Sequence, residues 1–101
     1  MSERIPVVVD ADLADLIPAF LANRRRDVDK LRALVAAQAF AEIRLLGHSM
    51  KGAGGGYGFD AITDIGAAIE HASLMQNVAA VQHETDRLAE YLTCVDVVFA
   101  K

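Results

Sequence analysis

The sequence predicts an all-α fold, an antiparallel up-down four-helix bundle with a short N-terminal helix or segment. Apolar residues recur at helical spacing through several long stretches, whereas no stretch alternates apolar and polar residues for more than a few positions. Four amphipathic helices joined by short connections cannot each bury an apolar stripe alone. An antiparallel bundle buries all four stripes against one another and is the simplest architecture that fits the pattern.

The chain has 101 residues, and we expect residues 1–101 to form a single domain. With 53% hydrophobic and 24% charged residues, it has enough apolar material for a core. The apolar run Val7–Val9 is far shorter than the roughly 20 residues of a membrane span. The single cysteine, Cys94, has no partner for an internal disulfide, which agrees with a reducing compartment. We therefore expect a cytoplasmic protein with no membrane partner.

The charge pattern argues against a nucleic-acid partner. The formal net charge is −4, whereas phosphate binding needs Lys and Arg gathered on one face. The basic triplet at residues 24–26 is the local exception, but Asp27 and Asp29 follow it within a helical pattern, which predicts a solvated helix face. Arg24 interrupts an apolar stripe, and we expect its aliphatic stem to cover apolar surface while its guanidinium reaches water.

The first helix is predicted over residues 11–36, after an N-terminal segment at residues 1–10. Asp10 or Asp12 can cap it by accepting hydrogen bonds from its free N–H groups. Pro18 cannot donate an N–H, so either a short helix ends just before it and Pro18 begins the next, or one helix kinks there. The apolar stripe consists of Leu13, Leu16, Ile17, Phe20, Leu21, Val28, Leu31 and Val35.

Three more helices are predicted over residues 39–55, 59–74 and 77–99. Asn77 can cap the last of them. No glycine or proline marks the boundary at residues 36–39, which is placed by the change in stripe phase. The three stripes are Phe40, Ile43, Leu46, Met50 and Ala53; Ile62, Ile65, Ile69 and Ala72; and Val78, Val81, Thr85, Leu88, Leu92, Val95 and Phe99.

Four glycines stand between Gly52 and Gly56, where the second helix should end. Each costs about 1 kcal/mol relative to alanine in a helix interior, or about 4 kcal/mol together. A frayed helix end with Gly58 as its stop signal explains Gly58 but not the earlier glycines. Close approach of another surface explains them better, because glycine has no side chain in the way. Local conflicts of this kind tend to lie at functional sites.

His48 lies on the face of the second helix opposite its apolar stripe. On a helical wheel at about 100° per residue, Arg44, Lys51, Gly52 and Gly55 fall within about 60° of it. The histidine therefore points away from the core, with one cation a turn before it and another a turn after it. Nearby cations favour a neutral, nucleophilic imidazole and offset the negative charge of a phosphorylated one. The spacing predicts a histidine site that handles anions.

The segment His48-Ser49-Met50-Lys51-Gly52-Ala53 is followed by Gly58, Ile62 and the pair Ile69-Glu70. This arrangement resembles the signature of the histidine phosphotransfer (HPt) domain family, roughly H-x-[LM]-K-G-[SA] with small residues and a second glycine after it. The match is close over residues 40–75, and the flanking helices agree in length and phase. The stretch after Gly52 is richer in glycine than usual, and Tyr57-Gly58-Phe59 departs from the small or aliphatic residue that many members carry before this glycine, which we interpret as a subfamily variant.

The resemblance implies a free-standing bacterial HPt protein of a two-component phosphorelay. His48 would be the phosphoacceptor, taking a phosphoryl group from one receiver-domain aspartate and passing it to another. Lys51 would assist by charge, and Gly52 would let the receiver's active site come close. Either imidazole nitrogen of His48 can be the one that is modified.

The implied partners are response-regulator receiver domains and a hybrid histidine kinase. Magnesium in such relays belongs to the receiver, so we expect no cofactor and no metal on this chain. We do not expect an enzyme, because the glycine run fits neither G-x-x-x-x-G-K-[ST] nor G-x-G-x-x-G. Docking would use Gly52, Gly55 and Arg44 together with Ala41 and Leu45, which flank the His48 face.

Two alternatives stay open. The chain can be the phosphoacceptor domain of a chemotaxis-type or hybrid histidine kinase, although a starting methionine and a near-complete bundle favour a free-standing protein. It can also be a non-catalytic helical interaction module in which His48 is only a surface residue. A metal site made by His48, His71 and His83 is not expected, because no two of them lie three or four residues apart and the last two fall on solvated faces.

Overall fold

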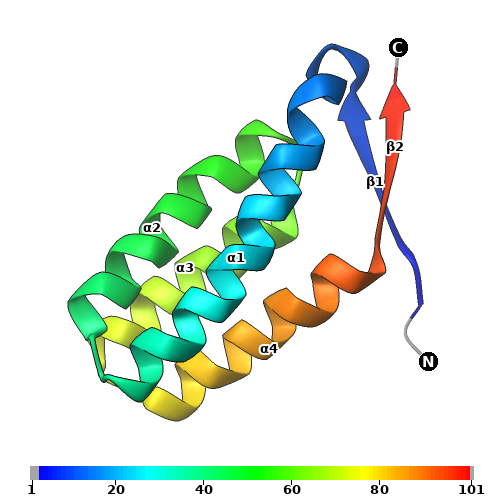
Figure 1. The fold of residues 1–101 in the computed structure, drawn as a ribbon. Helices are drawn as coiled ribbons and strands as arrows, with labels where there is room; N and C mark the ends of the chain where they lie inside the picture. The colour runs from blue at the N-terminus through cyan, green and yellow to red at the C-terminus, as the bar shows by residue number, and fades with distance from the viewer. Residues whose placement is uncertain (1–2, 101) are drawn as a thin grey trace.

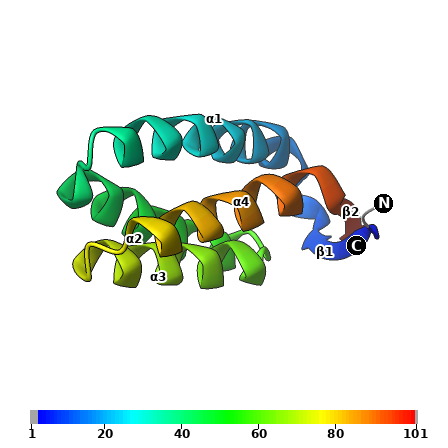
Figure 2. The same cartoon turned by 90° about the horizontal axis from the view of Figure 1, so that it is seen from below.

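The computed structural model describes residues 3–100 and confirms the all-α bundle (Figure 1). Its four helices are α1 (Ile17–Ala36), α2 (Phe40–Gly56), α3 (Asp60–Leu74) and α4 (Val78–Cys94), and each runs antiparallel to the next. Helix α1 packs on α2 and α4, and α3 packs on the same two helices, which closes the bundle. Figure 2 shows that the remaining elements lie beyond one end of the helices.

The core is filled by most residues of the predicted apolar stripes; the exceptions are Leu16, which is 51% exposed in the segment before α1, and Phe99, which is 45% exposed beyond the end of α4. Burial of each large apolar side chain contributes about 1.5–3 kcal/mol, so the stripes are the main source of stability. Phe59, from the α2–α3 connection, adds a fully buried ring that lies 5.3 Å from the ring of Phe20. The other fully buried apolar side chains of the helices are Leu31, Ile43, Met50, Ile62, Ile69, Val81 and Leu88.

The helix ends follow local chemistry. A short 3-10 helix, η1 (Ala11–Leu16), precedes α1, and Asp10 caps it by accepting a hydrogen bond from the Asp12 N–H at 2.9 Å. Pro18 lies in the first turn of α1, where its missing N–H costs nothing. The chain therefore breaks before Pro18 and begins a new helix, which is the first of the two predicted alternatives. Asn77 caps α4 through the Ala80 N–H at 3.1 Å, as predicted.

Two short strands differ from the prediction. Strand β1 (Ile5–Asp10) pairs in parallel with β2 (Val95–Ala100), with Ile5 opposite Val95. The prediction that the last helix extends to residue 99 is therefore wrong, because α4 ends at Cys94. Val95 and Phe99 are four residues apart and fit a helical stripe, but β-branched residues between them also favour a strand. Pairing with the distant N-terminal segment stabilises the strand over a continuation of the helix.

Arg24 and Asp27 form a largely buried ion pair, so the predicted solvated face is wrong for these two residues. The Arg24 Nε donates to Asp27 Oδ2 at 2.7 Å, and the side chains are only 14% and 11% exposed. The guanidinium also lies over the Phe20 ring, 5.0 Å from its centroid. Burial raises the pKa of the Asp27 carboxyl, and the charge of Arg24 opposes that shift. Opposite charges at positions i and i+3 compensate each other, which lets both residues leave water.

Helices α2 and α3 approach each other at three glycines. A Cβ on Gly47 would lie 2.8 Å from the Glu70 backbone nitrogen, and a Cβ on Gly66 would lie 2.6 Å from the Lys51 nitrogen. A Cβ on Gly54 would lie 2.7 Å from the Thr63 nitrogen. No side chain fits at these positions, because the obstacles are backbone atoms. The glycines therefore set the distance between α2 and α3.

Gly66→Ala should destabilise the bundle by about 1–3 kcal/mol, the usual cost of overpacking. The added methyl group would push the backbones of α2 and α3 apart. Gly52→Ala is the matched control, because nothing lies within 4 Å of a Cβ there; it should be neutral or stabilise by up to about 1 kcal/mol. Denaturant unfolding of the two variants measures the difference, and equal stability would contradict the close-packing account.

Candidate functional site

His48 lies on the exposed face of α2, as the helical wheel predicts. Its side chain is 66% exposed, whereas Gly47 and Met50 on the same helix are buried. An imidazole so placed is open to a macromolecular partner.

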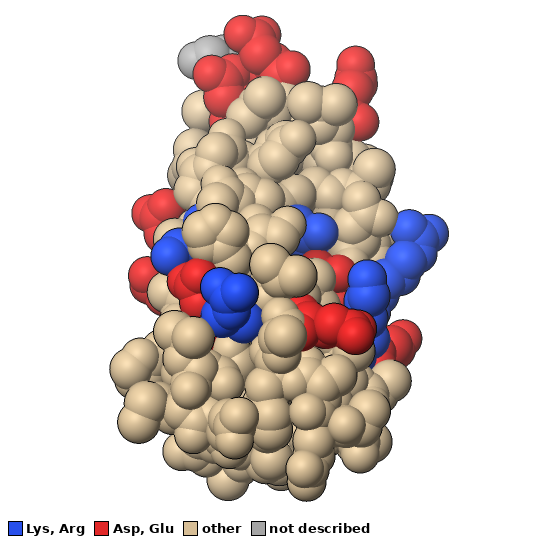
Figure 3. All heavy atoms as spheres, turned by 90° about the vertical axis from the view of Figure 1, so that its left-hand side faces the viewer, with Lys and Arg blue, Asp and Glu red and all other residues tan. Residues whose placement is uncertain are grey.

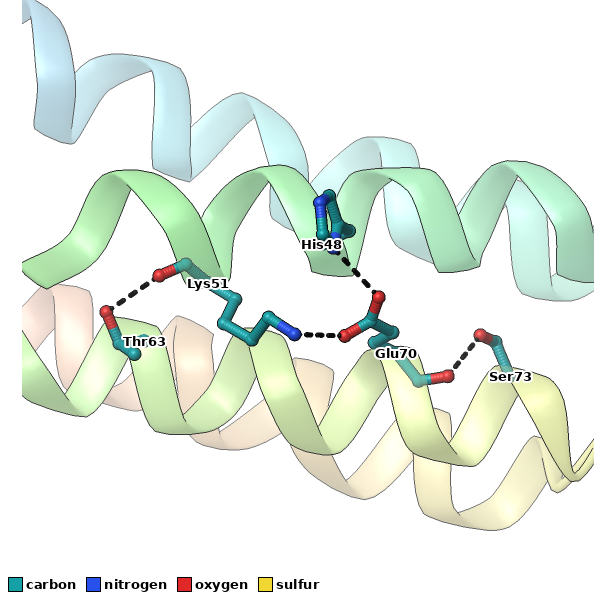
Figure 4. Close-up of polar contacts among 5 residues, drawn as sticks. All are labelled: His48, Lys51, Thr63, Glu70 and Ser73. Carbon is teal, nitrogen blue, oxygen red and sulfur yellow. Dashed lines mark hydrogen bonds and ion pairs between the residues drawn. The ribbon is translucent and has the colours of Figure 1, made fainter.

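Glu70 of α3 is hydrogen-bonded to both His48 and Lys51 of α2 (Figure 4). Its Oε2 lies 2.9 Å from His48 Nδ1, and its Oε1 accepts a hydrogen bond from Lys51 Nζ at 2.7 Å. A carboxylate can only accept, so the neutral imidazole carries its proton on Nδ1 and its lone pair on Nε2. Figure 4 shows the second ring nitrogen on the side away from Glu70. The ring nitrogen that carries the lone pair therefore faces outward.

The carboxylate of Glu70 is kept ionised by its neighbours. The hydrogen bond from Lys51 lowers the pKa of Glu70 most, and the bond to His48 lowers it further. Partial burial of the side chain, which is 19% exposed, opposes the shift without cancelling it. The site therefore presents a fixed negative charge behind the imidazole and a lysine tied to that charge.

Close packing of α2 against α3 brings these groups together. Gly47, which precedes His48 on α2, packs against the backbone of Glu70. Gly66, one turn before Glu70 on α3, packs against the backbone of Lys51. Thr63 Oγ1 also donates a hydrogen bond to the Lys51 carbonyl oxygen at 3.0 Å. Backbone contacts on both sides thus fix the separation of the three side chains.

The other predicted residues lie along the same exposed face of α2 but do not converge on the imidazole. Ala41, Arg44, Leu45, Gly52 and Gly55 are all exposed, and Leu45 is 60% exposed. A Cβ at Gly52 would meet nothing within 4 Å, and one at Gly55 would lie 3.5 Å from Thr63 Oγ1. Of the five glycines of α2, it is Gly47 and Gly54 that are closely packed within the chain, so Gly52 and Gly55 leave open surface.

Sequence reasoning assigned no role to Glu70 or Thr63. Glu70 stood in the motif match only as part of the pair Ile69-Glu70. Its contact with His48 joins two helices, and no helical spacing within one segment reveals such a contact. The helical wheel predicts Lys51 as a cation one turn after His48 and does not reveal its ion pair with Glu70.

The remaining histidines lie apart from this site. His71 and His83 are exposed on α3 and α4. Within residues 3–100, no group of three or more His, Cys, Asp or Glu side chains could hold a metal ion. In the same part of the chain, every helix is too short or too polar to cross a membrane.

Glu70→Gln should reduce the acid sensitivity of the fold. Because its pKa is lowered, ionised Glu70 contributes stability that is present above its ordinary value of 4.5 and lost as the pH falls through the lower native value. The gap in melting temperature between wild type and variant should be steady near neutral pH and narrow below about pH 4.5. Asp29→Asn, at an exposed position on α1, should show no such narrowing. A gap that stays constant in acid would contradict the pairing.

Comparison with known proteins agrees with this geometry. A family model described as "Hpt domain" matches residues 15–96, which include all four helices. Neither the curated proteins nor the solved structures provide a match. His48, Lys51 and Glu70 all lie in the matched span. The chain therefore belongs to the histidine phosphotransfer (Hpt) domain family, whose members are phosphotransfer modules of two-component systems and not kinases.

Proposed function

We propose that this protein is a cytoplasmic, free-standing relay that carries a phosphoryl group on His48 between receiver-domain aspartates. The observation that supports this most is the exposed imidazole whose Nδ1 is bonded to Glu70, which leaves the Nε2 lone pair facing outward. An inert surface histidine needs no such orientation. The partners are response-regulator receiver domains and an upstream hybrid histidine kinase.

The transfer step follows from the orientation of the ring. Nε2 attacks the phosphorus of an aspartyl phosphate, an N–P bond forms, and the P–O bond to the aspartate breaks so that the carboxylate leaves. The phosphorylated ring keeps its Nδ1 proton and gains positive charge, which Glu70 offsets at 2.9 Å. Passing the group on reverses these bonds on a second aspartate. The receiver supplies the magnesium ion and the acidic pocket, and this chain supplies a positioned nucleophile.

Cations near His48 favour the phosphorylated state. The phosphoryl group brings negative charge to Nε2, and Lys51 and Arg44 lie within one turn on either side. Lys51 remains 39% exposed while paired with Glu70, so it is accessible to the phosphoryl group as well. We assign Lys51 to charge stabilisation and Arg44 to partner docking.

The surface around His48 suits a flat protein partner. Figure 3, which views the molecule from the side of α2, shows a band of mixed charge across the middle, with uncharged surface below it and mostly uncharged surface above it up to acidic groups at the top edge. Exposed apolar residues of α2 are Ala41 and Leu45, which lie within two turns before His48, and Leu74 at the end of α3 is 63% exposed. Gly52 leaves open space on the other side of His48, and Gly55 adds no side chain there. A receiver can therefore bury apolar surface on one side and approach the backbone on the other.

Incubation with a small phosphodonor or a phosphorylated receiver should label the protein with an acid-labile, base-stable phosphoryl group. The label should be lost in His48→Gln and retained in His71→Gln, which removes an exposed histidine from α3. NMR of the labelled protein should place phosphorus on Nε2, because Nδ1 is bonded to Glu70. Absence of label with several active receivers would favour the interaction-module alternative. Label on Nδ1 would contradict the proposed role of Glu70.

Gly52→Leu should block receiver docking and leave the fold intact. The position has open space around it, so the new side chain would project toward the partner and not into the bundle. Transfer from a phosphorylated receiver should slow by about tenfold or more, equivalent to about 1.4 kcal/mol. Ala79→Leu, at an exposed position on α4, is the control and should transfer normally. Normal transfer by both variants, with unchanged melting temperatures, would show that the partner does not approach Gly52.

A further inference from the structure

The sheet formed by β1 and β2 leaves one edge of each strand open. In residues 3–100 the sheet has only two strands, so each has a partner on one side alone. Half of the backbone N–H and C=O groups of an edge strand point away from its neighbour and can pair with another strand. A two-stranded sheet is marginally stable in water and gains from added strands.

The two edges are not equivalent. β1 contains Pro6, which has no N–H to donate and protects an edge strand against pairing. β2 has the sequence Val-Asp-Val-Val-Phe-Ala, without proline or lysine. At its start, Arg4 donates hydrogen bonds to the carbonyl oxygens of Thr93 and Val95. The unprotected part of β2 is therefore the five-residue run from Asp96 to Ala100.

The side chains along this run favour pairing with an extended segment that is itself apolar. Val98 and Phe99 belong to neighbouring positions and so to opposite faces of the sheet, and they are 48% and 45% exposed. A strand added here would contact apolar groups on both faces. Asp96 is the one charge of the run, and it already faces Arg4 at 3.9 Å.

We infer that this edge pairs with β2 of a second copy of the chain, in antiparallel orientation about a two-fold axis at Val98. Such an axis joins the same run on both copies and gives a continuous four-stranded sheet. In this register Val98 lies opposite Val98, Val97 opposite Phe99, and Asp96 opposite Ala100. Apolar residues meet on both faces and the two carboxylates stay apart. An axis at Val97 would instead use Val95, whose carbonyl Arg4 occupies, and would set Asp96 against Val98.

Sedimentation equilibrium of the full chain should show a reversible dimer. Val98→Glu and Val98→Lys should each be monomeric, because each places two like charges directly opposite one another. An equimolar mixture of the two variants should recover the dimer, since glutamate then faces lysine. Val98 is half exposed in β2, so both variants should keep the far-ultraviolet circular dichroism of the wild type.

Val8→Glu is the matched control. Val8 is the register partner of Val98 on β1 and is 64% exposed. In the four-stranded sheet the two Val8 positions are three strand spacings apart, about 14 Å. Because this exceeds the Debye length of about 10 Å at 0.1 M salt, the control should remain dimeric. A wild type that is monomeric at every concentration would overturn the inference. So would a Val98→Glu dimer as stable as the wild type, or a mixture of folded variants that stays monomeric.

Discussion

Close packing of α2 against α3 is the constraint on which the site depends. Gly47, Gly54 and Gly66 let the two backbones approach until a single added carbon would collide with main-chain atoms. At this separation a glutamate on one helix reaches both a histidine and a lysine on the other. Helices held apart by ordinary side chains lie about 8–10 Å from axis to axis, and the same three residues would then be bridged less directly. Glycine, unfavourable in a helix, is here what brings Glu70 within hydrogen-bond distance of His48 and Lys51.

The electrostatics of the site follow from that geometry. The Glu70 carboxylate accepts hydrogen bonds from both His48 and Lys51. Its negative charge therefore stays in place, and the imidazole proton stays on Nδ1, the nitrogen that faces Glu70. The outer nitrogen then carries the lone pair without any further group to orient it. The same carboxylate accepts a hydrogen bond from Lys51 Nζ at 2.7 Å, so that lysine is not an isolated cation on the exposed surface. Orientation of the ring and charge balance are therefore provided by one residue.

Most of the fold was predictable from the sequence, because helical periodicity and caps are local properties. The stripes marked the four helices, and Asp10 and Asn77 began η1 and α4 as expected. His48 and Lys51 were found for the same reason, since their spacing lies within one helix. Features that join distant segments could not be predicted, namely the contact of Glu70 with His48 and the pairing of β1 with β2. In the sequence, the close contact of α2 and α3 is indicated by Gly47 and Gly66, because glycine inside a helical pattern is unusual.

The pairing of β1 with β2 has a consequence for the order of folding. Its first residue pair, Ile5 and Val95, joins opposite ends of the chain, so forming it closes a loop that contains the whole bundle. Closing so long a loop has an entropic cost that local helix contacts do not have, and non-local pairings of this kind form slowly. During synthesis β1 leaves the ribosome before the four helices and has no partner until the last helix is complete. The helices therefore assemble without the sheet, and the two strands join only after the bundle has brought their ends together.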